Sequence, residues 1–383
     1  MNELKCPFFK DCGGCDYLNL TYQEELDKKK KYIESLFKEI NYKNSIDIIG
    51  NDNPYFYRNK VTVAFKLSKT KKVTSGIYEE GSKKIVPIVD CLIQQKAIND
   101  CIQELNQILQ KNKILPFGYG GVLKHALIRY GINTNELLIT LVTNQEMFPG
   151  RNNVVKDIVN KIPNVKTIIQ NIQPRDTSIV LGEKERVLFG PGFITDKLCG
   201  LKFKITAKSF YQINPKQTEK LYGKAIEFAD LKKNEVMIDA YSGIGTIGLI
   251  ASKSVSKVIS VESNHVSIKM AKDNARINNI SNIEFYAEDS TEFLEDMSNS
   301  NNQIDCLILD PPREGSTYQF LDSVAKKRIK KVVYISCGPE SLIRDLKVLI
   351  SKGYEIKKVT AVDMFSKTKH VECVCKLTNR AGN

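Results

Sequence analysis

Beyond residue 210 the chain repeats one order of elements, in which an apolar strand is followed by a loop and a helical stretch. The strands are expected at 236–241, 257–262, 283–286, 304–310 and 331–336. Strands that alternate with helices predict a parallel, doubly wound sheet. Two further stretches, 354–362 and 371–377, are expected to form an antiparallel pair at its end. Such sheets bind ligands at the carboxyl ends of their strands.

A glycine-rich turn lies at this edge, between the first strand and the next helix. Its sequence, Asp-Ala-Tyr-Ser-Gly-Ile-Gly-Thr-Ile-Gly over 239–248, places Gly243, Gly245 and Gly248 in the spacing G-x-G-x-x-G. Glycines let the backbone approach a ligand closely, and Glu262 ends the second strand where a ribose hydroxyl needs an acceptor. The pattern alone fits a dinucleotide and S-adenosylmethionine comparably well.

Two acidic residues at later strand ends favour S-adenosylmethionine. Asp289 follows the third strand, where a carboxylate can reach an adenine amine. Asp310 ends the fourth strand, beside the methyl-donor end of such a cofactor. An ordinary turn acid is the alternative for each of them.

A cysteine and a glutamate are expected at the same edge. Cys337 precedes a helix that should begin at Pro339, and the helix N-terminus is expected to lower the pKa of the thiol. Glu372 lies in an apolar strand, where a carboxylate must be paired or functional because unpaired burial is costly. The residues expected to be structural are His370, Cys306, Cys373 and Cys375.

The thiol and the carboxylate suit covalent modification of a pyrimidine. Uracil C5 is too electron-poor to take a methyl group directly, but addition of a thiolate at C6 makes C5 an enolate-like nucleophile. A base then removes the C5 proton, and elimination releases the cysteine. Cys337 is the predicted nucleophile and Glu372 the predicted base.

The composition favours a nucleic-acid partner. The formal net charge is +13, although a lysine-rich background composition would give the same charge. No apolar stretch reaches the about 18 residues that a spanning helix needs, so we expect a cytoplasmic monomer without a membrane partner. Ten cysteines in a reducing compartment favour metal binding or catalysis over disulfides.

The part before residue 210 has a different pattern. After three closely spaced cysteines, a helix is expected over 21–40, and its lysine run 28–31 is a solvated face or an RNA contact. A strand-rich stretch then predicts a mixed, largely antiparallel β domain with a helix near 94–112. The expected divisions are 1–17 for the cysteine segment, 18–50 for a helical segment packed on the catalytic domain, 51–209 for the central β domain and 210–383 for the catalytic domain.

Taken together, these motifs resemble the RNA 5-methyluridine methyltransferases, in the iron–sulfur branch related to the bacterial 23S rRNA enzymes. The resemblance rests on the motifs at 209–214, 239–248, 310–313, 336–339 and 370–372, and it runs over nearly all of the chain. It implies an α/β fold with a Rossmann-like class I methyltransferase domain and a central β domain bearing a cluster. Many members begin with a further β-barrel RNA-binding domain, which we do not expect ahead of Cys6.

The resemblance also implies roles for individual residues. Cys337 would be the nucleophile and Glu372 the base. The contacts to S-adenosylmethionine would be Gln212, Tyr241, Gly243, Gly245, Thr246, Glu262, Asp289 and Asp310. The ligands of a [4Fe-4S] cluster would be Cys6, Cys12, Cys15 and the distant Cys91.

Other functions remain open at this point. A tRNA T-loop uridine is the nearest alternative to 23S rRNA, whereas a 5-methylcytosine enzyme is disfavoured because Arg313 and not a cysteine follows Pro312. An NAD-dependent oxidoreductase would leave the cysteines unexplained, and a non-catalytic RNA-binding protein would be expected to lose Cys337 or Glu372. The target uridine must be unstacked for C6 to be reached. The expected RNA contacts are Arg58, Lys60, Lys124 and Arg129.

Overall fold

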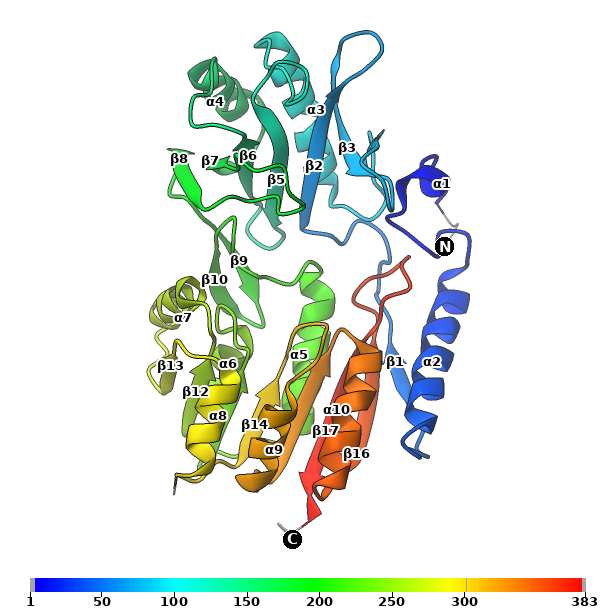
Figure 1. Cartoon of the computed structure of the whole chain (residues 1–383), viewed down its shortest axis with the longest axis vertical. Coiled ribbons are helices and arrows are strands. Elements are labelled where there is room, and N and C mark those ends of the chain that lie inside the picture. The colour runs from blue at the N-terminus through cyan, green and yellow to red at the C-terminus, as the bar shows by residue number, and fades with distance from the viewer. Residues whose placement is uncertain (1–3, 301, 381–383) are drawn as a thin grey trace. The chain divides into compact units, whose positions relative to one another are not determined.

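The computed structural model describes residues 4–300 and 302–380, which form two compact units (Figure 1). The first unit contains residues 4–19, Asn53–Lys197 and Lys204–Pro215, and the second contains Leu20–Asp52, Leu198–Phe203 and Lys216 onward. The chain therefore passes between the units several times. The expected divisions after residues 17, 50 and 209 lie within six residues of three of these limits, whereas the crossing of Leu198–Phe203 into the second unit was not expected.

The first unit is built on a seven-stranded sheet in the order β4-β3-β2-β5-β6-β7-β8. All neighbouring strands are antiparallel except β6 and β7, so the predicted mixed, largely antiparallel domain is confirmed. Its strands are β2 (Lys60–Leu67), β3 (Val73–Tyr78), β4 (Ile85–Pro87), β5 (Leu123–Gly131), β6 (Glu136–Thr143), β7 (Val165–Ile172) and β8 (Lys184–Phe189). Its helices are α1 (Phe9–Cys12), α3 (Lys96–Lys111) and α4 (Arg151–Lys161).

Two amphipathic helices close the core of this unit. The apolar faces of α3 and α4, which include Ile98, Leu105 and Ile158, pack in one cluster with Ile128 and Ile139 of the sheet. A separate two-stranded sheet, β9 (Ile194–Leu198) and β10 (Leu201–Ile205), has residues in both units.

The second unit is built on an eight-stranded sheet in the order β1-β16-β17-β15-β14-β11-β12-β13. Its strands are β1 (Asp47–Ile49), β11 (Val236–Ala240), β12 (Lys257–Val261), β13 (Ile283–Tyr286), β14 (Cys306–Leu309), β15 (Lys331–Ser336), β16 (Tyr354–Val362) and β17 (Glu372–Asn379). Its helices are α2 (Tyr22–Lys38), α5 (Pro215–Ala229), α6 (Thr246–Ala251), α7 (His265–Ile277), α8 (Ser290–Ser298), α9 (Tyr318–Lys326) and α10 (Pro339–Ser351), with a 3-10 turn, η1 (Ser252–Ser254), after α6.

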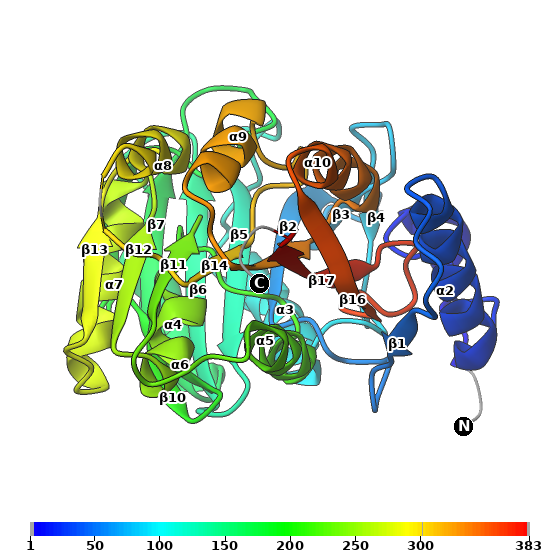
Figure 2. The same cartoon turned by 90° about the horizontal axis from the view of Figure 1, so that it is seen from below.

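The pairing within this sheet fixes the edge at which a ligand would bind. Strands β11 to β15 are parallel, and β17 is antiparallel to both β15 and β16, as predicted. Helices α8, α9 and α10 cover one face, and α5 and α6 lie on the other (Figure 2). Because β17 runs against its neighbours, its first residue lies at the same edge as the last residues of the parallel strands. The short strand β1, which pairs in parallel with β16, was not predicted.

Helix α2 joins the second unit through an apolar face and a buried ionic network. Thr21 caps its N-terminus reciprocally with Glu24, and Ile33 and Phe37 enter the core of the sheet. Lys29 is only 1% exposed and pairs with Glu25 at 2.8 Å and with Asp363 at 2.6 Å. The prediction of a solvated face for the lysine run is therefore wrong at Lys29, because two buried carboxylates surround its ammonium group.

Candidate active site and cysteine cavity

The glycine-rich turn follows β11 and is held by hydrogen bonds from its own backbone. Gly243 and Gly245 have φ values of 55° and 80°, a region that glycine adopts without steric cost. The Gly243 amide donates to Glu262 Oε2 at 3.0 Å, so the acid at the end of β12 fixes the turn from the neighbouring strand. Tyr241, which begins the turn, also has a positive φ of 60°.

Asp239 is a site residue that sequence reasoning did not single out. Its side chain is fully buried, and its Oδ2 accepts a hydrogen bond from the Gly248 amide at 2.8 Å. A Cβ atom on Gly248 would lie 2.8 Å from that same oxygen, so this contact requires glycine. Burial is the main reason that the pKa of Asp239 is raised to about 7. The signal was present, because Asp239 is the one carboxylate in the apolar strand β11.

The other predicted cofactor contacts are placed as follows. Thr246 is the first residue of α6, and the Tyr241 hydroxyl shares a hydrogen bond with Ser316 at 2.9 Å. Asp289 caps α8, and its Oδ1 accepts from the Thr291 amide at 2.8 Å, so one carboxylate oxygen has a structural role. Gln212 belongs to the first unit and not to the second, where the other predicted contacts lie.

The strand register brings the predicted nucleophile and base together. In the ladder of β15 and β17, Ser336 lies opposite Cys373. Because the two strands are antiparallel, the next position of the same register sets Cys337 beside Glu372. The last residue of β14, Leu309, lies beside β15 in the parallel ladder, so Asp310 follows it at this same edge.

Glu372 is a buried carboxyl group, and one of its oxygens has no hydrogen-bond partner among the described residues. Its side chain is 2% exposed, and the oxygen in question is Oε2. Burial, with a smaller contribution from the charge of Asp310, raises the pKa of Glu372 well above its ordinary value. Loss of hydration likewise raises the pKa of Asp310 to about 7. Two carboxyl groups thus share a site that favours their protonated forms.

The expected lowering of the Cys337 pKa is wrong. The thiol does lie between β15 and α10, and Pro339 does open that helix. Burial first, and then the neighbouring Glu372 and Asp310 carboxylates, raise the pKa of Cys337 to about 11. Desolvation and like charges therefore outweigh the helix terminus in the free protein.

Arg313 lies in the loop after β14 and contacts His370 and Ser341. Its guanidinium lies 3.0 Å from His370 Nδ1, and its carbonyl accepts from the Ser341 hydroxyl at 2.8 Å. A Cβ atom on Gly338 would lie 2.4 Å from the same carbonyl oxygen, so glycine is required beside Cys337. The positive charge of Arg313 partly offsets the rise in the Cys337 pKa.

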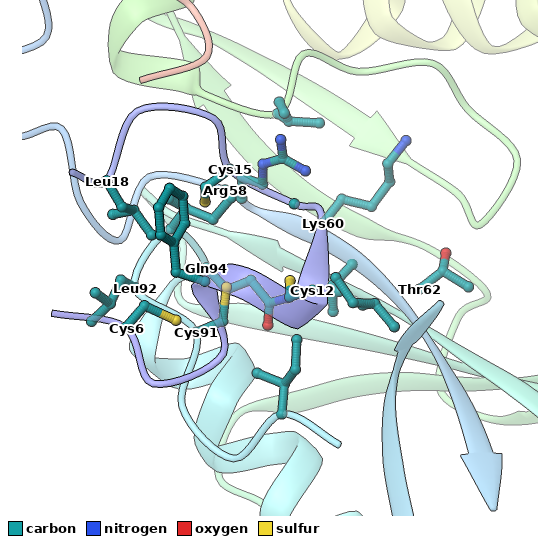
Figure 3. A pocket seen from close by; sticks show the side chains of 17 residues that line it. Cys6, Cys12, Cys15, Leu18, Arg58, Lys60, Thr62, Cys91, Leu92 and Gln94 are labelled. Carbon is teal, nitrogen blue, oxygen red and sulfur yellow. The ribbon is translucent and has the colours of Figure 1, made fainter. Parts of the chain in front are cut away.

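The first unit contains a separate cavity of about 250 Å³ lined by cysteines. Cys6, Cys12, Cys15 and Cys91 line it together with the Arg58 guanidinium (Figure 3). Burial, followed by repulsion from Cys91, raises the pKa of Cys15 to about 12. Burial also raises the pKa values of Cys12 and Cys91. Buried thiols with raised pKa values form thiolates only when a cation or a metal centre lies beside them.

The spacing of these thiols does not match a single metal ion. Across the described residues, no group of three or more His, Cys, Asp or Glu side chains is arranged to hold one ion. A tetrahedral zinc site needs sulfurs at about 2.3 Å from a common centre.

Three of the four expected RNA contacts have other surroundings in the fold. The prediction for Arg129 is wrong, because its buried guanidinium donates to the backbone carbonyls of Ala207 and Ser209. Arg58 and Lys60 both line the cysteine cavity.

In the described parts of the chain, no helix has the length and apolar character to cross a membrane.

Comparison with known proteins identifies the family of this chain. The family described as tRNA (Uracil-5-)-methyltransferase matches residues 21–380. An uncharacterized RNA methyltransferase of Bacillus cereus is 37% identical over 97% of this chain and 82% of the relative. One from Clostridium tetani is 37% identical over 98% of this chain and 83% of the relative.

A solved structure supports the same assignment. The Pyrococcus abyssi tRNA (uracil-54, C5)-methyltransferase, in complex with S-adenosyl-L-homocysteine, superimposes with a TM-score of 0.79 and 27% identity over 96% of this chain and 86% of that one. The second unit therefore has the class I S-adenosylmethionine-dependent methyltransferase fold. This chain belongs to the tRNA (uracil-5-)-methyltransferase family of RNA methyltransferases.

Proposed function

We propose that this protein methylates C5 of a uridine in 23S rRNA, with Cys337 as nucleophile and Glu372 as base. The observation that carries the proposal is the register of β15 and β17, which sets the thiol beside a buried carboxyl group with one oxygen that has no hydrogen-bond partner among the described residues. S-Adenosylmethionine, held at the glycine-rich turn, would supply the electrophilic methyl group.

Cys337 and Glu372 would act in two successive steps. The Cys337 thiol first loses its proton to solvent, and its sulfur then forms a bond to uracil C6. The electrons of the C5–C6 double bond make C5 the nucleophile that takes the methyl group, with S-adenosylhomocysteine as the leaving group. Glu372 then takes the C5 proton, and those electrons restore the double bond as the bond between sulfur and C6 breaks. Glu372 must be ionised to take this proton, and in that form its raised pKa makes it a stronger base for the carbon acid than an exposed carboxylate.

The cofactor contacts are proposed from their place in the fold. The turn from Tyr241 to Thr246, braced by Glu262, would hold the amino acid and ribose parts, and Asp289 retains one carboxylate oxygen for the adenine. Asp310 would lie at the reacting end. Gln212 is proposed as a further contact on the family resemblance alone.

The cysteine cavity is proposed to hold a [4Fe-4S] cluster. The fit rests on four thiols around one enclosed space and on the Arg58 guanidinium beside them, which would offset the negative charge of a thiolate-bound cluster. Such a cluster would tie the N-terminal segment to the loop that carries Cys91. We assign the catalytic step to Cys337 and Glu372 alone.

The choice of 23S rRNA follows the resemblance to the iron–sulfur branch. The solved relative acts on tRNA uridine 54, so the tRNA T-loop is the second candidate substrate. A cytoplasmic monomer is the form we propose, because both candidate RNAs are cytoplasmic and the predicted nucleophile and base lie in one chain.

Release of tritium from uracil C5 tests the proposal. Unmodified 23S rRNA and unmodified tRNA, each labelled with tritium at uracil C5, are incubated separately with the protein and S-adenosylmethionine. Release from 23S rRNA is the expected result. Release from tRNA alone would keep the mechanism and overturn the substrate, and release from neither would overturn the covalent mechanism.

A further inference from the structure

The first unit has a second and larger cavity that the proposed chemistry does not use. Its volume is about 750 Å³, and it lies over β2, β3 and β5, which are neighbours in the sheet (Figure 1). Loops after α3, after β3 and after β7 complete its rim. The lining residues that matter here are Lys66, Tyr78, Lys83, Phe117, Tyr119, Lys124 and His125.

Exposed aromatic rings surround this cavity. Tyr78, Phe117 and Tyr119 are 46%, 42% and 47% exposed. A single exposed ring is ordinary, but three at one hollow present flat apolar faces to the same ligand. Lys124 lies over the Phe117 ring, with its ammonium 5.3 Å from the ring centre, which holds that ring in place. Faces of this kind stack on nucleobases of any sequence.

The charge at the cavity is positive. The Lys124 ammonium donates to the backbone carbonyl of Arg175 at 2.6 Å, and the Lys66 ammonium donates to that of Ile85, so neither charge is neutralised by an acid. Lys83 has no ion-pair partner among the residues that the structure describes. Asp176 is the only acidic residue among the described lining residues. A ligand with negative charge is therefore favoured.

A neutral polar pair lies among the rings. The Tyr78 hydroxyl is 3.1 Å from His125 Nε2, and burial lowers the pKa of His125 to about 4. The imidazole is thus uncharged at neutral pH, and either tautomer can pair with the phenol. The Tyr78 hydroxyl can then offer a donor or an acceptor to the edge of a base, which suits more than one nucleobase.

We infer that this cavity binds an unpaired nucleotide of the substrate RNA, with its base against the aromatic rings and its phosphate near Lys83. The inference rests on the proposed RNA substrate. It adds a contact made by the first unit alone, at a flanking nucleotide that is not methylated.

The absence of tryptophan from the chain allows a direct test. Tyr119→Trp places a single tryptophan at the cavity, and Phe189→Trp places one on the edge strand β8, outside the lining residues. Titration with single-stranded oligouridine should quench the first and leave the second unchanged. Tyr119→Ala should weaken oligouridine binding by about five- to 150-fold. Lys83→Ala should reduce the salt dependence of binding by about one phosphate contact.

The outcomes separate this inference from the proposed function. A wild-type protein that methylates RNA, together with an unquenched Tyr119→Trp and a Tyr119→Ala that binds normally, would overturn the cavity and leave the function standing. Quenching by uridine monophosphate but not by oligouridine would replace RNA with a free nucleotide as ligand. Quenching by oligouridine in a protein that methylates no RNA would keep the cavity and overturn the function.

Discussion

Replacement of Lys29 by methionine should lower the free energy of unfolding of the second unit by about 3–5 kcal/mol. The Lys29 ammonium donates to Glu25 at 2.8 Å, to Asp363 at 2.6 Å and to the Phe365 carbonyl at 3.2 Å. Both carboxylates are fully buried. Removal of one partner from a buried ion pair typically costs that amount, because the remaining charge is left unpaired.

The rest of the network replaces the lost charge only at Glu25. Lys367 is the nearest other cation, and its ammonium lies 3.8 Å from Glu25 Oε2. Methionine fills a similar volume but donates no hydrogen bond, so packing changes little while the electrostatic loss remains. The affected segment, from Asp363 to Lys367, leads into β17, so activity should fall with stability because Glu372 begins that strand.

Thermal unfolding of the full chain measures this effect. For a domain of this size each kcal/mol shifts Tm by about 2–4 °C, so the second unit should melt about 6–20 °C lower. Lys31→Met is the matched control, because Lys31 is exposed on the same helix. Hydrogen exchange would locate the loss in α2 and in the segment after Asp363. Equal melting temperatures for the two variants would refute the reasoning.

Four further predictions concern the two sites. Cys337→Ala should abolish turnover and any covalent RNA adduct while cofactor binding, measured by calorimetry, stays unchanged; retained turnover would remove Cys337 from the mechanism. Glu372→Gln should lower kcat by about 10²- to 10⁴-fold and trap a methylated adduct on denaturing gels, and a native rate would require another base. Asp239→Asn should flatten the dependence of Tm on pH. The stability that the folded pKa of about 7 confers is full below the unfolded value of about 3.9 and is lost as the pH rises through 7, and an unchanged pH profile would contradict this. Cys12→Ser should remove visible iron–sulfur absorbance from protein purified without oxygen, whereas Cys199→Ser, outside the cavity, should not; a colourless wild type would count against the cluster.

Much of the second unit could be predicted because its pattern is local. Each strand is a short apolar run followed by a helix. That alternation predicted a parallel sheet, and with it the edge of the sheet at which Cys337 and Glu372 lie. The pKa of Cys337 could not be predicted in the same way. The helix N-terminus is a local feature, but the carboxylates that oppose it come from β14 and β17, and their distance depends on the tertiary fold.

Residues in the first part of the chain were misread for a related reason. Lys29 lies in a run of four lysines, and Arg129 interrupts the apolar residues of a strand. Both therefore resemble surface cations in sequence. Their partners, Asp363 and the carbonyls of Ala207 and Ser209, are far away along the chain. Burial of a cation by such distant groups leaves no local signal.

The contact between Lys29 and Asp363 spans 334 residues, and this has a consequence for synthesis on the ribosome. At about 5–20 residues per second, helix α2 would wait about 20–70 s for its acidic partner to be made. The strands of the seven-stranded sheet, with α3 and α4, all come between these two residues and can fold during that interval. The nascent chain therefore carries α2 without the acidic partner of Lys29 until Asp363 has been made, and the Cys337–Glu372 pair can form only after β17 has been synthesised.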